Sequence, residues 1–551
     1  MGISIFVRDS FWGRLIYHLS SHKYFYHKEE SLDYVIPDKY LQKVMSVESD
    51  NNKAEVNNEQ GVQLESDNSG TTSSDERIIV TWDGEDDPNN PKNWPMYLKV
   101  LIIIQVCFLT IVVYMSSAIF TPGIEVMMED LKISRVEATL PMTMFVIGYG
   151  IGPMFLSPMS ESAVFGRTNI YIITLFLFFI LQIPISIVNN IGGLAVLRFF
   201  SGIVASPSLA TGAASMGDIT KMPYLPITIA IWSVSAVCGP SLGPIFGSVL
   251  VIKRDWHWTF WLIAMTSGIS LIIFSICLPE TFEKTLLLRK ARRLRKVTGN
   301  PNIVSEGELE NENLNIREMT VDILWRPFEI SFFEPVVLLI NIYIALIYSM
   351  IYLWFEAFPI AYLETYHFTL VTMGVAYMSV AVGVFVGASI YVVLIYKKFI
   401  IPFFEQKPIS PETFIPIMIV GSIIMPMGIF VFGWTVSPDT HWIGSMIGAG
   451  LFSVGSFITF QSSFLYLANS FPRYLASVFA GNALFRSDIA AVFPLFGDAL
   501  FNNLATEKFP VGWGSSVIAF ICVGMILVPV LFYLNGPKLR ARSKYSGFHH
   551  R

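Results

Sequence analysis

The stretch YLPITIAIWSVSAVCGPSLGPIFGSVLV, residues 224–251, contains no charged side chain and is long enough to cross the hydrocarbon core of a bilayer. About a dozen apolar stretches of similar length follow one another between Leu98 and Leu534. Because lipid offers no hydrogen bonds to the backbone, each such stretch has to be a helix that satisfies its own amide groups. The sequence therefore predicts an all-α membrane protein that crosses the bilayer many times.

We expect twelve transmembrane helices in two six-helix halves around a central cavity, because one polar, charged insert divides the apolar stretches into two sets. The expected spans are approximately residues 98–120, 136–157, 168–189, 192–216, 224–251, 258–280, 334–360, 371–396, 412–436, 442–467, 474–498 and 514–534. The resulting segments are an N-terminal tail (1–97), a first half (98–280), a central loop (281–333), a second half (334–534) and a C-terminal tail (535–551).

Composition and charge support this organisation. With 53% hydrophobic and 14% charged residues, the chain is too apolar for a soluble protein of its size, and nothing in it suggests nucleic-acid binding. All four cysteines fall inside apolar spans, so we predict no disulfide. An even number of spans places both termini on one side, and clustered Lys and Arg in the central loop and after the last span indicate that this side is cytosolic.

Two polar segments outside the spans have a predicted structure or location. The Ser-, Asn- and Glu-rich run from Ser46 to Glu76 should be disordered. The central loop contains LPETFEKTLLLRKARRLRKVTGN, residues 278–300, which has the pattern of a basic amphipathic helix. We expect this helix to lie on the anionic inner leaflet.

Glycines recur every fourth residue in the quoted stretch, at Gly239, Gly243 and Gly247, and so form a stripe along one face of a helix. Small residues at this spacing allow close helix packing. Pro240 and Pro244 remove backbone donors and add points where the helix can bend. We expect a packed seam between the halves that can seal the cavity against a proton leak.

Charged residues within the spans are the candidates for proton coupling. Arg198, in the fourth span, is costly there unless it faces water or a partner, and a snorkelling arginine is the alternative. Glu356, in the seventh span before Pro359, could take up a proton among its aromatic neighbours, or it could be an acid wetted from outside. Arg486 and Asp488 point to different faces of the eleventh span, and we expect each to pair with another span.

A short loop after the second span combines glycine with acidic and basic residues: Gly152, Glu161, Gly166 and Arg167. Acid and base in a cytosolic turn can hold neighbouring helices in one state and release them in another. We expect a conformational role for this loop and a solvated position for Asp218, at the inner end of the fourth span.

Aromatic and polar residues in the spans are the candidates for the substrate cavity. Aromatic faces suit amphipathic or cationic guests, and polar residues in mid-span tend to face the protein interior. Packing against neighbours or lipid is the alternative for most aromatics. The candidates are Tyr114, Asn341, Tyr348, Tyr352, Phe457, Gln461 and Asp488.

No constellation of catalytic residues is present in the spans, because no histidine lies in mid-span beside an acid or a cysteine: His257, His367 and His441 are at outer helix ends, and His549 and His550 are in the C-terminal tail. We therefore expect no enzyme activity, no metal site and no cofactor, with a proton gradient as the source of energy.

Several longer motifs resemble the fungal major facilitator drug/proton antiporters of the fluconazole and benomyl resistance type. These motifs are WDGEDDPNNPKNWP (82–95), DWHWTFWL (255–262), LPETFEKTLLLRKARRLRKVTGN (278–300) and FRSDIAAVFPLFGDALFNNLATEKFPVGWGSSV (485–517). The resemblance implies a twelve-span plasma-membrane exporter. It places proton coupling on Arg198, the antiporter motif on the glycine stripe and the loop signature on the turn after the second span, where Glu161 replaces the usual Asp.

The function that we expect is proton-driven efflux of structurally diverse drugs by a monomer in the lipid bilayer. The substrate enters the cavity from the cytosol or the inner leaflet, the halves rock, and a proton taken up from outside resets the carrier. Three alternatives remain open at this point: a selective exporter of polyamines or other organic cations, a nutrient sensor on a transporter scaffold, and a passive facilitator.

Overall fold

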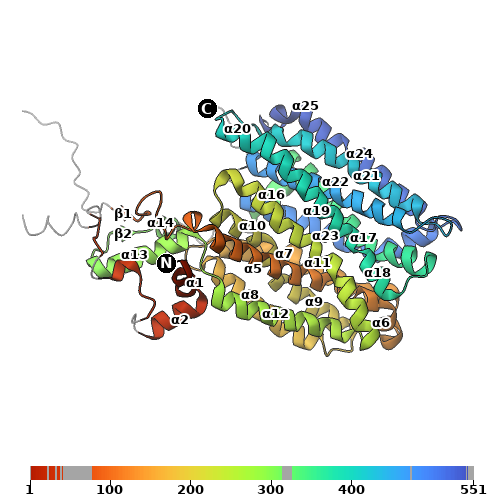
Figure 1. Cartoon of the computed structure of the whole chain (residues 1–551), viewed down its shortest axis with the longest axis horizontal. Helices are drawn as coiled ribbons and strands as arrows, with labels where there is room; N and C mark the ends of the chain where they lie inside the picture. Colours follow the sequence, from red (N-terminus) through yellow and green to blue (C-terminus); the bar gives the residue numbers. More distant parts are fainter. Residues whose placement is uncertain are drawn as a thin grey trace, which may run out of the picture.

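Long helices lie side by side in an elongated bundle in the computed structural model of the chain (Figure 1). The structure describes residues 2–20, 24–31, 34–37, 40, 77–312, 325–471, 475–541 and 543. The run expected to be disordered, 46–76, lies outside the described residues, as do residues 313–324 of the central loop and nearly all of the C-terminal tail after residue 541.

Each of the twelve expected spans corresponds to a helix or to a pair of consecutive helices. The first set consists of α5 (Met96–Ala118), α7 (Arg135–Ser160), α8 (Gly166–Ile185), α9 (Ile191–Ala205) with α10 (Pro207–Ile219), α11 (Leu225–Lys253) and α12 (His257–Cys277). The second set consists of α17 (Pro335–Phe358), α18 (Leu370–Ala376) with α19 (Met378–Ile395), α21 (Ile415–Thr435), α22 (Ile443–Ser470), α23 (Leu475–Asn503) and α24 (Gly512–Met525) with α25 (Leu527–Ala541). The predicted all-α class is confirmed.

Within the described residues, 11 helical segments are long and apolar enough to cross a membrane. The twelfth, α23, has 29 residues and packs against both α7 and α17, but it contains Arg486, Asp488 and Asp498. These charges lower its hydropathy, so packing rather than composition identifies α23 as a member of the bundle.

Local sequence explains where several helices begin and break. Ser134 starts α7 with a capping box, since its hydroxyl accepts from the backbone of Glu137, whose carboxylate accepts from Ser134 in return. Asn190 caps α9 by accepting from the backbone N–H of Gly192. Pro207 divides the fourth span into α9 and α10 because it cannot donate into a continuous helix.

The two ends of the bundle differ in what they carry. The helices α1 (Gly2–Asp9), α2 (Phe11–Leu19) and α13 (Glu283–Thr298) lie at the same end as the C-terminus, which we call the terminal end. The short helix α6 (Ile124–Leu131) lies at the opposite end, which we call the far end (Figure 1).

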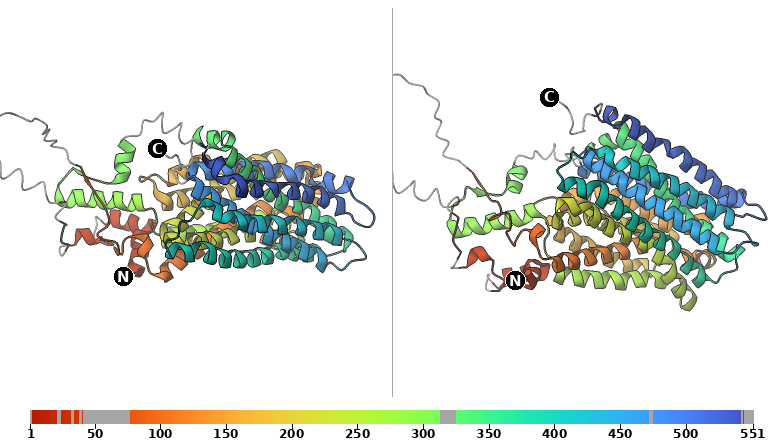
Figure 2. Two further views of the ribbon diagram at one scale, coloured as in Figure 1. Left: turned by 90° about the horizontal axis from the view of Figure 1, so that it is seen from above. Right: turned by 45° about the horizontal axis from the view of Figure 1, so that its top comes forward.

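The sequence predicts that the basic helix α13 lies flat on the inner leaflet, across the ends of the membrane spans. In the structure it extends beyond the bundle and is covered by the N-terminal tail (Figure 2). Its buried Leu287, Ala291 and Leu294 share an apolar cluster with Tyr40 and Val80. The prediction of an inner-leaflet helix is therefore wrong, because the chain itself supplies the cover for the apolar face.

Backbone pairing and ion pairs hold the tail against α13. The strand β1 (Ile78–Ile79) pairs in parallel with β2 (Ile303–Val304). Nearby, the Lys290 Nζ lies 2.6 Å from the Asp83 Oδ1, and Trp82 donates to the Glu283 Oε1 over 2.6 Å. We call the N-terminal segments together with α13 and β2 the N-terminal module.

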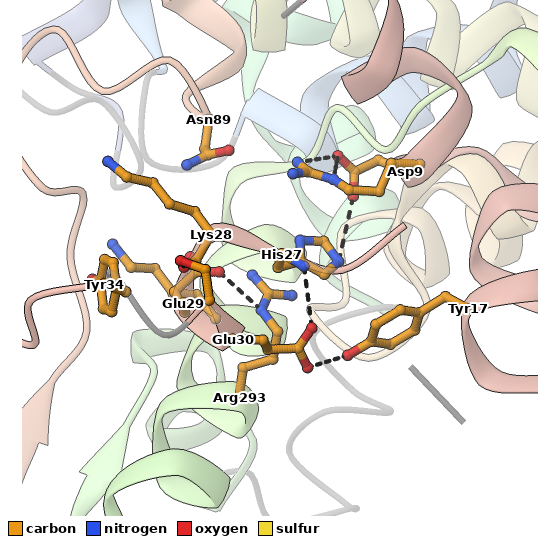
Figure 3. Close-up of polar contacts among 12 residues, drawn as sticks. Asp9, Tyr17, His27, Lys28, Glu29, Glu30, Tyr34, Asn89 and Arg293 are labelled. Carbon is orange, nitrogen blue, oxygen red and sulfur yellow. Dashed lines mark hydrogen bonds and ion pairs between the residues drawn. The ribbon is translucent and has the colours of Figure 1, made fainter. Parts of the chain in front are cut away.

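The contacts between α13 and the first thirty residues surround His27 (Figure 3). The Arg293 Nε lies 3.3 Å from the Glu29 Oε2, while the carboxylate of Glu30 accepts from the Tyr17 hydroxyl and from the His27 backbone. The His27 ring lies 4.0 Å from the Asp9 carboxylate. Charged side chains thus connect the N-terminal helices to the central loop.

Candidate functional site: a cavity between the two helix sets

A cavity of about 70 Å³ lies between the two sets of helices. Helices α5 and α11 of the first set and α17, α19, α22 and α23 of the second set form its wall. The lining is mostly apolar and aromatic, as in sites that bind small apolar molecules, but a drug-sized guest would have to widen the cavity. Its position at the junction of the helix sets means that a movement of one set against the other would change its access.

Four of the seven sequence candidates line this cavity, namely Tyr114, Tyr348, Phe457 and Gln461. The other three lie behind the wall. Asn341 accepts a 2.8 Å hydrogen bond from Asn482, which joins α17 to α23. The hydroxyl of Tyr352 lies 2.9 Å from that of Tyr149, which also contacts the Tyr348 hydroxyl at 2.7 Å.

Asp488 is the third candidate outside the lining. It lies where α23 meets α7, and its Oδ1 would be 3.1 Å from a Cβ placed on Gly150. That oxygen is buried and has no hydrogen-bond partner among the described residues. Asp488 therefore belongs to a helix junction and not to the cavity surface, and its expected pairing with a charge on another span is not found in the described part of the chain.

Arg486 lines the cavity, although we had expected it to pair with an acid from another span. Its side chain is 8% exposed, and its guanidinium carbon lies 4.8 Å from the centre of the Tyr348 ring and 5.4 Å from that of Phe460. Among the described residues, no carboxylate comes within ion-pair distance of it. The charge is stabilised by aromatic faces rather than by an opposite charge.

Arg198 is completely buried, with 0% exposure, and its hydrogen-bond partners are neutral oxygens. It donates to the Ser116 hydroxyl at 2.9 Å and to the Ser116 carbonyl at 2.7 Å, with a longer contact to the Pro141 carbonyl at 3.4 Å. Because α5 ends at Ala118, the Ser116 carbonyl is one of those left without a helical partner. Arg198 thus joins the end of α5 to α7 and α9, and it is not a snorkelling side chain.

Glu356 is 1% exposed, so the alternative of an acid wetted from outside does not apply. Its Oε2 lies 3.1 Å from the Arg135 Nη2 at the start of α7. The Arg135 Nε also lies 3.5 Å from the Asp498 Oδ1 on α23. One arginine of the first set thereby holds two acids of the second set near the far end, which we call the far-end bridge. The sequence analysis did not identify Arg135 as a candidate. Its only signal in the sequence is its position directly after Ser134, the residue that caps α7.

The glycine stripe of α11 packs against α5, a helix of the same set. A Cβ on Gly239 would lie 2.6 Å from the Tyr114 Cβ, and one on Gly247 would lie 1.9 Å from the Ile119 carbonyl oxygen. A Cβ on Gly243 would come 3.1 Å from the Ile119 nitrogen. The stripe therefore forms a seam within the first set, in place of the expected seam between the halves.

The other side of α11 does face the second set. The carbonyl oxygen of Pro244 lies 2.8 Å from the place where Gly374 of α18 would carry a Cβ. Both Pro240 and Pro244 are buried within α11. The helix with the antiporter-like motif thus touches α5 through its glycines and α18 through the proline-bearing segment.

Arg167 is buried at the terminal end, where its Nη2 donates to the Asp218 Oδ1 at 3.3 Å. The Thr281 hydroxyl donates to the same carboxylate at 3.0 Å. Asp218 is therefore the acid that pairs with Arg167, and the expectation that it is solvated is wrong. Glu161 is exposed and has no ion pair within the described residues.

Gly166 and Gly152 have geometric reasons to lack a side chain. Gly166 has a φ of +69°, and a Cβ there would lie 2.4 Å from a Glu280 carboxylate oxygen. Glu280 is buried and accepts from the backbone N–H of Arg167 at 3.0 Å and of Thr281 at 3.1 Å. On α7, a Cβ on Gly152 would lie 2.2 Å from the Ser206 hydroxyl. The loop after the second span is thus fixed to α10 and to the start of the central loop.

A bundle of membrane-spanning helices in two sets, with an apolar and aromatic cavity between them and charged pairs at both ends, is the architecture of a multi-pass membrane transporter. The family model of the Major Facilitator Superfamily matches residues 106–494, and the chain belongs to this family. The solved structure of the xylose transporter XylE from E. coli, partially occluded and inward open, has a similar fold, with a TM-score of 0.53 at 13% identity over 80% of this chain and 98% of that one.

Similar sequences include proteins whose names refer to drug resistance. The cycloheximide resistance protein of Candida maltosa is 52% identical and covers 99% of this chain and 100% of its own. The fluconazole resistance protein 1 of Saccharomyces cerevisiae is 41% identical over 88% of both chains. The multidrug transporter FLR1 of Candida glabrata is 42% identical over 89% of this chain and 87% of its own.

Proposed function

We propose that this protein exports structurally diverse, toxic apolar compounds across the plasma membrane in exchange for protons. The resistance proteins named above support the class of substrate, and the apolar, aromatic lining of the cavity suits such molecules. The basic residues at the terminal end support an orientation with both termini in the cytosol. We propose that the protein works as a monomer, since one chain encloses the cavity.

The far-end bridge is the observation on which proton coupling rests. Glu356 is buried on the second set, and its carboxylate faces Arg135 of the first set. A proton that neutralises Glu356 removes its attraction to Arg135, so protonation and separation of the two sets at the far end become coupled events. Glu356 is therefore the proposed proton carrier.

Arg198 has a different proposed part in the coupling. Its hydrogen bonds fix the end of α5 against α7, and α7 begins with Arg135 of the far-end bridge. We propose that Arg198 is a positioning residue. Its charged side chain holds α5 and α7 in a fixed relative position, and α7 carries Arg135 of the far-end bridge. Its loss would disturb coupling without removing the group that takes up the proton.

The alternatives make different demands on the structure. A carrier of polycations needs acids in its cavity, whereas the charged residue that lines this cavity in the described part of the chain is Arg486. A passive facilitator would not respond to the proton gradient. A nutrient sensor would signal without transport.

The test is efflux of labelled fluconazole from a yeast host that lacks its own drug pumps, with and without a protonophore. Wild type is compared with Glu356→Gln and Arg198→Ala at equal surface expression. Glu364→Gln is the matched control, because Glu364 lies in the π-helical continuation of the same span but is exposed. We expect the protonophore and Glu356→Gln to abolish efflux and Glu364→Gln to leave it unchanged. Efflux that ignores the protonophore would refute proton coupling.

A further inference from the structure

The cavity wall presents hydrogen-bond donors without partners, and no acid is among the described residues that line it. Arg486 is 8% exposed and its Nε has no hydrogen-bond partner in the described residues. The Gln461 Nε2 is in the same situation, on a side chain that is 1% exposed. The Ser456 hydroxyl is the third such group, and all three residues line the same cavity.

Unsatisfied donors in an apolar cavity are costly, and a buried cation without an anion is more so. Aromatic faces reduce this cost for Arg486, since the Tyr348 ring lies 4.8 Å away. They leave the Arg486 Nε and the Gln461 Nε2 without an acceptor among the described residues. A guest that brings an acceptor into the cavity removes this deficit, whereas a guest with a positive charge adds repulsion to it.

From this arrangement we propose that Arg486 and Gln461 form the specificity site of the cavity. The site takes aromatic guests that are anionic, and neutral aromatic guests that carry a hydrogen-bond acceptor such as a carbonyl or a ring nitrogen. It discriminates against permanent cations. This inference rests on the proposed export function for its physiological meaning, but the binding preference itself does not depend on transport.

The shape of the wall agrees with such a guest. Tyr348 and Phe460 hold Arg486 between them, and Phe457 and Trp232 supply further aromatic surface. The Trp232 Nε1 is already used, since it donates to the Thr110 hydroxyl at 3.0 Å. The ring systems therefore offer stacking area, while the open donors for recognition come from Arg486 and its neighbours.

Guests of one shape and opposite charge test the proposal directly. Tetraphenylphosphonium and tetraphenylborate differ in charge but hardly in size, and triphenylphosphine oxide is a neutral relative with a strong acceptor. Their binding to the purified full-length protein in detergent is measured by calorimetry and corrected for binding to empty micelles. We expect tetraphenylborate and triphenylphosphine oxide to bind at least about tenfold more tightly than tetraphenylphosphonium.

Variants assign the preference to particular residues. Arg486→Gln should remove the preference for the anion, while Arg486→Lys should keep it, because the charge remains. Gln461→Leu should weaken binding of the phosphine oxide but not of tetraphenylborate. Arg254→Gln is the matched control: Arg254 also lies over an aromatic ring, 5.2 Å from the centre of Trp258, but is exposed and does not line the cavity.

Two outcomes would overturn the inference. The first is that wild type binds tetraphenylphosphonium as tightly as tetraphenylborate, or more tightly. The second is that a folded Arg486→Gln protein keeps the wild-type preference for the anion. Failure of the proposed function looks different. In that case the wild type shows the charge preference, but fluconazole efflux is absent or ignores the proton gradient. If fluconazole efflux depends on the proton gradient but wild type shows no charge preference in binding, the proposed specificity site is wrong and the proposed function stands.

Discussion

Arg135 on α7 and Glu356 on α17 meet across the junction of the two helix sets, with 3.1 Å between the guanidinium Nη2 and the carboxylate Oε2. Glu356 is almost fully buried, while 27% of the Arg135 side chain is exposed. Solvent therefore reaches the arginine side of the pair, while the carboxylate stays enclosed. Since the residues lie 221 positions apart in the chain, only the assembled bundle brings them together.

A charge swap separates the structural part of this pair from its part in coupling. Arg135→Glu alone should place three acids together, because Asp498 also lies beside this position, and should lower efflux at least about tenfold. Adding Glu356→Arg should recover much of the melting temperature in detergent but not proton-dependent efflux, because an arginine does not release its proton. Recovery of gradient-driven efflux in the double variant would show that Glu356 is not the proton carrier.

Arg198→Ala should destabilise the protein by about 3 kcal/mol, because it leaves buried carbonyl groups on Ser116 and Pro141 without donors. Arg198→Lys should lose less, since an ammonium group can still reach one of these acceptors. The measurement is the thermal unfolding midpoint of the purified protein. Equal midpoints for wild type and Arg198→Ala would contradict the positioning role.

Gly247→Ala should be among the most damaging single-methyl additions in α11. The new Cβ would lie 1.9 Å from the Ile119 carbonyl oxygen, and the backbone of α5 would have to shift at a cost of about 1–3 kcal/mol. Gly243→Ala, with its nearest atom at 3.1 Å, should cost less. Gly524→Ala is the control, because nothing lies within 4 Å of its Cβ position. Thermal unfolding and surface expression should follow this order.

Asp218→Asn should be far more damaging than Glu161→Gln, although the sequence motif points to Glu161. The first change leaves the guanidinium of Arg167, whose side chain is only 6% exposed, without its anion, which costs about 3 kcal/mol or more. The second alters an exposed side chain with no ion pair among the described residues. Folded yield and efflux of the two variants provide the comparison, and equal losses would contradict the assignment of Asp218.

The N-terminal module should loosen as the pH falls. Burial lowers the pKa of His27 to about 3, with Arg293 and Arg8 acting in the same direction and Asp9 and Glu29 opposing them. The unfolded segment takes up a proton near pH 6.5 and the folded one does not, so the module loses about 1.4 kcal/mol for each pH unit below that value. Stability is therefore complete above pH 6.5 and declines toward pH 3.

Hydrogen exchange in α2 and residues 27–30, compared at pH 7.5 and 5.5 after correction for the intrinsic rates, checks this expectation. His27→Gln should abolish the difference between the two conditions. His257→Gln, at a more exposed histidine that pairs with Asn189, should leave the difference in place. Protection that does not change between the two pH values in wild type would contradict the burial of a neutral His27.

The sequence by itself determined the class and most helix boundaries. These follow from local physics: apolar length is set by the bilayer, backbone groups must be satisfied within each span, and residues such as Ser134 and Pro207 mark a start and a break. It also indicated that Gly239, Gly243 and Gly247 share one helix face, because a fixed spacing needs no knowledge of other helices.

Only the tertiary structure decided which faces meet. Arg486 lines the cavity, whereas Asp488 lies at a helix junction. The glycine stripe packs against α5 and not against the second helix set. The partner of Arg167 is Asp218 and not Glu161 of the loop motif. Likewise, the apolar face of α13 was covered by the N-terminal tail instead of by lipid. The physical reason is the same in each case: hydropathy and spacing fix what a helix is, but its rotation and neighbours depend on packing between segments far apart in the chain.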